Sequence, residues 1–152
     1  MRIGLISDTH GLLRASALEA LRGSEQIIHG GDIGEASVLE ALAQIAPLTV
    51  VRGNKDTAPW AQVLPEQARL QVGPIGVLIV HDLKSLAPLA SAWHPRVIVS
   101  GHSHQSAVRE EGGVLYVNPG SAGPRRFRLP ISVAELIITE DQVRARIIEL
   151  PP

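Results

Sequence analysis

The sequence predicts a single domain of the α/β or α+β class over residues 1–152, with two β-sheets in its centre and helices outside. Two observations support this class. The first third of the chain alternates short aliphatic runs with amphipathic stretches, which is the pattern of βαβ units in a mostly parallel sheet. From residue 66 onward, strand-like segments joined by short turns indicate antiparallel pairing.

The first part of the chain is expected to form three strands separated by two helices. Leu13, Ala17 and Leu21 share one face of the first helical stretch. Gly23 and Pro47 mark the ends of the two helices, since glycine favours a helix C-terminus and proline disfavours helix before it. The expected strands are 2–7, 25–30 and 48–53, and the expected helices are 12–22 and 35–46.

The second part is expected to form three hairpins and one further buried strand. The hairpin turns fall at Gly73-Pro74 with Gly76, at 111–113 and at 140–141. A helix is also expected over 84–93, although Pro88 disfavours it. The expected strands are 68–72, 76–82, 96–101, 106–110, 114–118, 132–139 and 143–150.

Composition limits the functions open to the chain. There is no cysteine, which excludes a disulfide framework, a cysteine zinc site and a thiol nucleophile. Fourteen Lys and Arg against fifteen Asp and Glu give a net charge of -1, without the basic excess that stable duplex binding uses. The apolar stretch after Met1 is too short for a signal peptide or a membrane span, so a cytoplasmic protein without membrane contact is expected.

Polar clusters with metal-binding side chains follow five of the predicted strands. The loops beyond the carboxyl ends of strands are where α/β proteins bind ligands. Each cluster alone has an ordinary interpretation, as a helix cap, a solvated histidine or a glycine turn. Five such loops together favour a metal site. The candidate ligands are Asp8, His10, Asp32, Asn54, His81, His102 and His104.

These seven oxygen and nitrogen donors are too many for one tetrahedral zinc and suit two ions that share a carboxylate. Imidazole, carboxylate and amide donors favour manganese, nickel, iron, zinc or cobalt over calcium, and manganese is our favoured ion. The sequence therefore predicts two divalent metal ions as cofactors.

The ordered motifs Asp8-x-His10, Gly31-Asp32, Gly53-Asn54-x-Asp56, His81 and Gly101-His102-x-His104 resemble the calcineurin-like metallophosphoesterase superfamily. The short length and the segment 118–121 resemble its small, YfcE-like phosphodiesterase branch. The resemblance implies a four-layer α/β/β/α sandwich and hydrolysis of a small phosphoester, with a diester favoured. It also implies that Asp8, His10 and His104 hold one metal, that Asn54, His81 and His102 hold the other, and that Asp32 bridges them.

The chain departs from the family pattern at two positions. Lys55 stands where many members have a histidine that assists the leaving group, and Asp82 stands where glycine is usual. Lys55 is either a source of positive charge for phosphoryl oxygens or a plain exposed lysine. Asp82 either supports a histidine ligand or narrows substrate access. The expected catalytic residues are Asp32, Asn54, Lys55 and Asp56, and Asn54, Arg125 and Arg126 are expected to bind substrate, with a solvated turn as the alternative for the two arginines.

The expected mechanism is in-line attack on phosphorus by a hydroxide that bridges two metals roughly 3.5 to 4 Å apart. Three alternatives remain: a phosphomonoesterase of the same fold, an amidohydrolase, and a protein-interaction scaffold such as the retromer subunit that resembles these enzymes. A homo-oligomer, dimer or tetramer, is compatible with the sequence. His29 either orients Asp32 or is a core histidine bonded to backbone, and His94 is expected at the surface. The sparse aromatic residues are expected in the core or an interface, with stacking on a nucleobase as the alternative; they are Trp60, Trp93 and Tyr116.

Overall fold

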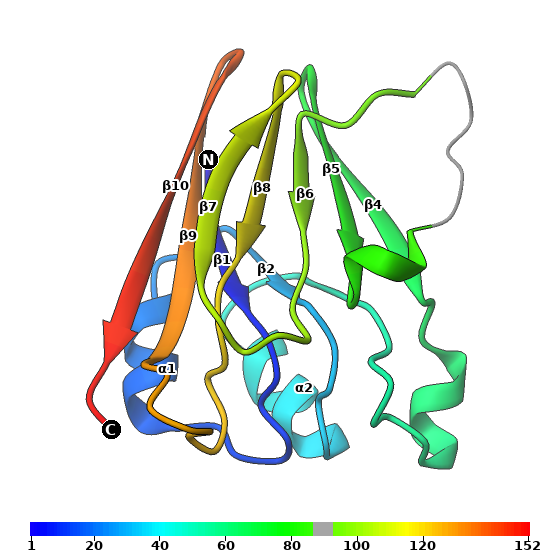
Figure 1. Ribbon diagram of the computed structural model, residues 1–152, viewed down its shortest axis with the longest axis vertical. Helices are drawn as coiled ribbons and strands as arrows, with labels where there is room; N and C mark the ends of the chain where they lie inside the picture. The colour runs from blue at the N-terminus through cyan, green and yellow to red at the C-terminus, as the bar shows by residue number, and fades with distance from the viewer. Residues whose placement is uncertain (87–92) are drawn as a thin grey trace.

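The computed structural model describes residues 1–86 and 93–152, which form two five-stranded sheets packed against each other (Figure 1). The strands are β1 (Arg2–Ile6), β2 (Gln26–His29), β3 (Leu48–Val50), β4 (Gln67–Val72), β5 (Ile75–Val80), β6 (Val97–Val99), β7 (Ala107–Glu111), β8 (Val114–Asn118), β9 (Ile131–Thr139) and β10 (Gln142–Leu150). The helices are α1 (Ala15–Leu21) and α2 (Ala36–Ala43), with short 3-10 segments η1 (Pro59–Val63) and η2 (Leu83–Ser85). The strand orders are β10-β9-β1-β2-β3 and β4-β5-β6-β8-β7.

The first sheet is parallel through β1, β2 and β3, because α1 and α2 return the chain across one of its faces. The amphipathic spacing seen in the sequence places Leu21 and Leu42 of the two helices on this face. There they pack with Ile6 and Ile27 of the sheet. The antiparallel hairpin of β9 and β10 then extends the sheet beyond β1.

The second sheet is mixed. β5, β6 and β8 run parallel, while β4 and β7 pair antiparallel at its two edges. All six residues of β5 are buried, since this strand is covered on both faces. Gly76 lies within β5, where the ring of Trp93 packs so closely against it that an added Cβ atom would lie 2.9 Å from the ring.

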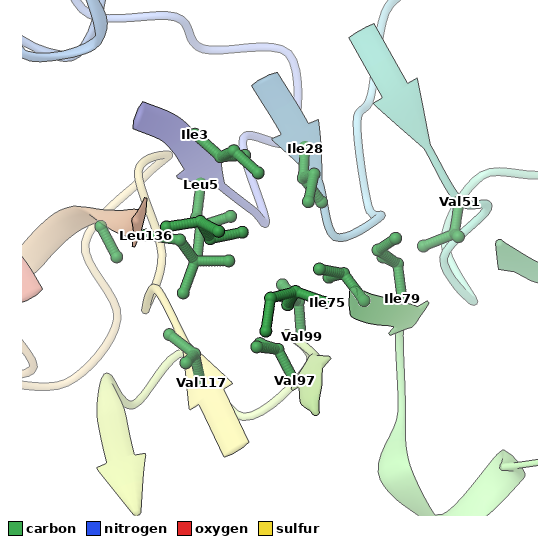
Figure 2. Packing of buried hydrophobic residues seen from close by; sticks show 13 residues of the cluster. Ile3, Leu5, Ile28, Val51, Ile75, Ile79, Val97, Val99, Val117 and Leu136 are labelled. Atoms are coloured by element: carbon green, nitrogen blue, oxygen red, sulfur yellow. The ribbon is translucent and has the colours of Figure 1, made fainter. Parts of the chain in front are cut away.

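The main core lies between the two sheets and is built from aliphatic side chains (Figure 2). Ile3 and Leu5 of the first sheet point toward Val99 and Val117 of the second, and all four are at most 1% exposed. Burial of each such side chain contributes about 1.5–3 kcal/mol relative to exposure. This core fixes the sheets as a rigid base under the loops at one edge.

The predicted fold class of two mixed sheets with helices outside is confirmed. In the described ranges, the α-helices cover the outer face of the first sheet. The helix expected over 84–93 lies partly outside the described residues. Its first residues form the 3-10 segment η2. Within residues 1–86 and 93–152, no helix combines the length and apolar character that crossing a membrane requires.

Candidate metal centre

The five loops that carry the predicted ligands meet at one edge of the two sheets. They follow β1, β2 and β3 of the first sheet and β5 and β6 of the second. Backbone hydrogen bonds join them: the N–H of Asp8 donates to the carbonyl of Gly31 (3.0 Å), and the N–H of Gly101 donates to that of His81 (2.9 Å). The strand ends therefore bring donors from distant parts of the sequence to one place.

Five of the seven candidate ligands have a left-handed backbone conformation. The φ angles are 54° for Asp8, 46° for His10, 57° for Asp32, 73° for His102 and 63° for His104. A non-glycine residue in this region costs on the order of 1–3 kcal/mol and persists only where the surroundings determine it. The concentration of such residues in these loops indicates that the chain gives up stability to aim these side chains inward.

One group of donors consists of Asp8, His10 and His104, whose ligand atoms all lie within 4.8 Å of one another. Oδ1 of Asp8 lies 3.9 Å from Nε2 of His10 and 3.5 Å from Nε2 of His104. The two imidazole rings stack with centroids 5.3 Å apart. This spacing leaves room between the three groups for one cation.

A second group consists of Asp8, Asp32 and His81, with the same mutual limit of 4.8 Å. Oδ2 of Asp32 lies 3.3 Å from Nε2 of His81 and 3.7 Å from Nε2 of His10. Both carboxylates therefore lie between the two groups.

The amide of Asn54 extends the second group toward the surface. Its Oδ1 lies 3.1 Å from Nε2 of His81 and 3.3 Å from Nδ1 of His102. Asn54 and His102 are exposed, whereas His81 is buried. Asn54 and His81 also line a cavity of about 170 Å³ whose other walls include Arg52 and Asp82. The second group is thus the side of the centre that a ligand can reach from this cavity.

Two of the five buried side-chain polar atoms without hydrogen-bond partners among the described residues face the interior of the centre. Oδ1 of Asp8 and Nε2 of His10 are buried and have no hydrogen-bond partner among the described residues. A buried polar atom left unpaired costs about 1–3 kcal/mol, so native structures seldom retain one without a function. Both atoms face other ligand candidates, which fits residues that bind a cation.

The electrostatics also favour positive charge at this position. Burial raises the pKa of Asp8, although His81 and Ser7 oppose the change. Burial would raise the pKa of Asp32 too, but its hydrogen bonds with His81 and with the N–H of Lys55 outweigh burial and lower it. Burial likewise opposes the charged form of His81, yet its contact with Asp32 raises its pKa. The two carboxylates therefore draw a positive charge between them.

Asp56 holds the Asp32 loop against the Asn54 loop. Its carboxylate is buried and accepts four backbone hydrogen bonds, from the N–H groups of Asp32, Ile33, Gly34 and Gly53 at 2.8 to 3.2 Å. Sequence reasoning grouped Asp56 with the catalytic residues. Because its oxygens are already bonded to these N–H groups, its contacts are those of a positioning residue instead.

Gly53 is required by the same close approach of the two loops. A Cβ atom at this position would lie 2.1 Å from Oδ1 of Asp32 and 2.2 Å from its backbone nitrogen. The N–H of Lys55 donates to that same Oδ1 at 2.9 Å, while the side chain of Lys55 is exposed. Lys55 thus contributes to the centre through its backbone.

His29 joins the loop after β1 to the loop after β2, and no hydrogen bond links it to Asp32 among the described residues. Its Nδ1 accepts the N–H of Gly31 and its Nε2 lies 3.0 Å from Oγ1 of Thr9. Complete burial lowers the pKa of His29 to about 3, so the ring is neutral. Since Nδ1 accepts, Nε2 carries the proton and donates to Thr9, whose hydroxyl donates to the carbonyl of Ile33 (2.8 Å).

Two residues near the centre carried no predicted role. Ser7 donates to Oδ2 of Asp8 at 2.7 Å and orients that carboxylate. Asn118 donates to the carbonyl of Gly101 (3.0 Å) and the hydroxyl of Ser103 (3.1 Å), which fixes the loop that carries His102 and His104. Asn118 stood in the segment that resembled the small phosphodiesterase branch, whereas Ser7 had no signal beyond its place before Asp8.

The remaining candidates lie at the margin of the centre. Oδ2 of Asp82 lies 3.8 Å from Nε2 of His102, on the side away from Asn54. Arg126 is exposed. The pKa of His104 is lowered, chiefly by burial and also by the positive charge of Arg126, while the carboxylate of Asp8 opposes the change. Arg125 donates to a carbonyl within its own loop.

The residues given only weak signals pack elsewhere. Trp60 packs against the cluster under the helices, and Trp93 and Tyr116 pack over the outer face of the second sheet. Arg69 lies over the ring of Trp93. His94 is exposed, as expected. These aromatic rings are therefore packing residues.

Comparison with known proteins identifies the family. Residues 1–141 match the model of the calcineurin-like phosphoesterase superfamily domain. The chain belongs to this superfamily. A probable metallophosphoesterase of Methanothermobacter thermautotrophicus is 33% identical, with 97% of this chain and 92% of the relative aligned. The phosphodiesterase YfcE of Escherichia coli is 29% identical, over 90% of this chain and 87% of YfcE. The predicted family and branch are confirmed.

Solved structures share the fold at lower identity. An archaeal phosphodiesterase superposes with a TM-score of 0.79 at 22% identity and covers 97% of this chain and 100% of its own. Vps29 of Entamoeba histolytica, solved in complex with zinc, superposes with a TM-score of 0.74 at 20% identity and covers 98% and 99% of the two chains. The two-sheet architecture is thus shared by proteins named as enzymes and by Vps29.

Proposed function

We propose that this protein is a metal-dependent phosphodiesterase that binds two divalent ions between the β1, β2, β3, β5 and β6 loops. The observation that carries the proposal is the position of Asp8 and Asp32. Both carboxylates lie between two groups of imidazole donors, and Oδ1 of Asp8 is buried without a hydrogen-bond partner in the described part of the chain. The family is that of the calcineurin-like phosphoesterases, and the relatives are named a probable metallophosphoesterase and a phosphodiesterase, which supports the same chemistry here.

The residues that would hold the ions follow from the two groups. Asp8, His10 and His104 would hold one ion, and His81, Asn54 and His102 would hold the other, with Asp32 between them. When bound, the ions would supply Lewis acidity for the activation of water and positive charge for a phosphoryl group. The donor set of imidazole, carboxylate and amide suits manganese, iron, nickel, zinc or cobalt alike, and manganese remains the ion we favour among them.

The side chains of the centre bind and orient the substrate. The exposed amide of Asn54 lies at the cavity and is placed to donate through Nδ2 to a phosphoryl oxygen while its Oδ1 faces the histidines. Arg126, whose charge lowers the pKa of His104, supplies positive charge beside the group of Asp8, His10 and His104. A phosphodiester, which carries an ester group on both sides of phosphorus, suits a centre flanked by a cavity and an arginine loop.

The hydrolysis of bis-p-nitrophenyl phosphate tests this proposal. Chelator-treated protein is expected to be inactive and to recover activity with added Mn²⁺. Asp32→Ala is expected to abolish that activity, because it removes the carboxylate between the two groups. Asp141→Ala, at an exposed position, is the matched control and is expected to retain it.

Two outcomes would contradict the proposal. Hydrolysis of p-nitrophenyl phosphate in large excess over the diester would favour a phosphomonoesterase. Failure to bind any divalent ion, with normal folding, would favour a protein-interaction scaffold.

A further inference from the structure

The turn between β8 and β9 displays an aromatic ring among arginines. Phe127 is 92% exposed, the largest exposed fraction of any large hydrophobic side chain in the described ranges. Arg125, Arg126 and Arg128 are exposed around it. A single exposed apolar residue is common on protein surfaces, so the argument depends on its backbone and its location.

The backbone at Phe127 disfavours a bulky residue. The N–H of Leu129 donates to the carbonyl of Arg126 at 3.1 Å and closes a four-residue turn with Phe127 in its second position. The φ angle of Phe127 is 54°, and turns with a positive φ at this position are dominated by Gly, Asn and Asp. A left-handed side-chain-bearing residue costs about 1–2 kcal/mol, and exposure forgoes about 1.5–3 kcal/mol of burial. Folding alone therefore does not account for phenylalanine here.

The turn is anchored to the metal-binding loop after β1. The hydroxyl of Ser121 donates to the carbonyl of Asp8 at 3.0 Å, and the N–H of Ala122 donates to the carbonyl of Ser7 at 3.1 Å. Gly123 lies so close that a Cβ atom would be 2.3 Å from the carbonyl oxygen of Thr9. Figure 1 shows the yellow-to-orange connection of β8 and β9 beside the blue loop after β1, at the edge where the centre lies. Phe127 follows this anchor by only four residues.

We propose that Phe127 stacks on a nucleobase of the substrate while Arg126 binds a phosphate oxygen, so that the substrates are nucleoside phosphodiesters. This inference rests on the proposed phosphodiesterase function and names its substrate class. Aromatic side chains beside cationic ones are the usual means of binding single-stranded nucleotides, with about 1–3 kcal/mol per stacked base. A net charge of -1 agrees with short or single-nucleotide substrates and not with duplexes.

Two substrates with the same leaving group test the proposal. The Mn²⁺-loaded protein is assayed on thymidine 5′-p-nitrophenyl phosphate and on methyl p-nitrophenyl phosphate, which lacks the base. The wild type is expected to prefer the thymidine ester in kcat/KM. Phe127→Ala is expected to reduce that preference about tenfold, within the range of one stacked base, and Phe127→Trp is expected to restore it.

Val63→Ala provides the matched control. Val63 is 85% exposed, and its segment η1 lies on the opposite side of the molecule from the β8–β9 turn in Figure 1. This variant is expected to retain the wild-type preference. Urea unfolding checks that Phe127→Ala remains folded. Phe127→Gly is a second variant without the ring, and glycine adopts the positive φ angle of this position without strain.

The binding of fluorescein-labelled hexathymidylate, measured by fluorescence anisotropy without metal, separates this inference from the proposed function. If neither the wild type nor any variant hydrolyses either ester, the proposed phosphodiesterase function is rejected. The role of the Phe127 ring is then tested by hexathymidylate binding alone, and Phe127→Ala is expected to weaken that affinity about tenfold. An unchanged substrate preference and unchanged hexathymidylate affinity in the variants without the ring would overturn the inference.

Discussion

The buried carboxylate of Asp56 determines how the ligand loops are held. Its Oδ2 accepts from the N–H groups of Asp32 and Gly53, and its Oδ1 accepts from those of Ile33 and Gly34. In Asp56→Asn one oxygen becomes an NH₂ group, so two of the four N–H groups face a donor. Hydrogen bonds to charged groups contribute about 1.5–3 kcal/mol each. We therefore expect the free energy of unfolding to fall by about 3–6 kcal/mol, twice that contribution.

Urea unfolding followed by circular dichroism measures this loss. Asp141→Asn, at an exposed position, is the matched control and is expected to change stability by less than about 0.5 kcal/mol. Because Asp56 positions the loops of Asp32 and Asn54, titration calorimetry with Mn²⁺ is expected to show an affinity about 10–100-fold lower. A loss below about 1 kcal/mol in Asp56→Asn, with unchanged Mn²⁺ affinity, would refute this account of the loops.

Two further predictions follow from contacts within the fold. Gly53→Ala places a Cβ atom 2.1 Å from Oδ1 of Asp32, so calorimetry is expected to show Mn²⁺ affinity reduced at least about tenfold. The control Gly112→Ala, at a turn with open space around it, is expected to retain the wild-type affinity. Equal Mn²⁺ affinities of the two variants would contradict the prediction. Burial opposes ionisation of Glu135, but its hydrogen bond with Arg2 outweighs burial and lowers its pKa below 4.5. The stabilising contribution of the ionised carboxylate is therefore present above about pH 4.5 and is lost as the pH falls through the lowered pKa of the folded state. Urea unfolding is expected to show Glu135→Gln less stable than wild type at pH 7, with the gap narrowing in acid, and a gap independent of pH would exclude this linkage.

The sequence was sufficient to predict the strands and the meeting of the candidate ligand loops at one edge of the sheets. The two-residue and helical periodicities reflect burial directly, and burial decides both the strands and the helices of this chain. The meeting of the candidate donors could be predicted because Asp8, Asp32 and His81 stand within a few residues of the end of a buried strand, and parallel strands end at a common edge.

The supporting contacts could not be read from the sequence because they depend on three-dimensional approach. Nothing in the order of residues shows that Asp56 accepts N–H groups from a loop more than twenty residues earlier. The hydrogen bond between His29 and Thr9 also depends on the approach of the end of β2 to the loop after β1. The exposure of Phe127 depends on a turn whose backbone departs from the usual preference of its residue type. In each case tertiary contacts outweigh local preference.

The proposed function requires that two divalent ions bind between the carboxylates of Asp8 and Asp32. Anomalous difference maps from crystals grown with Mn²⁺ test it most directly. We expect two peaks per chain, roughly 3.5 to 4 Å apart, one beside His10 and His104 and the other beside His81. A single peak, or peaks away from both carboxylates, would contradict it.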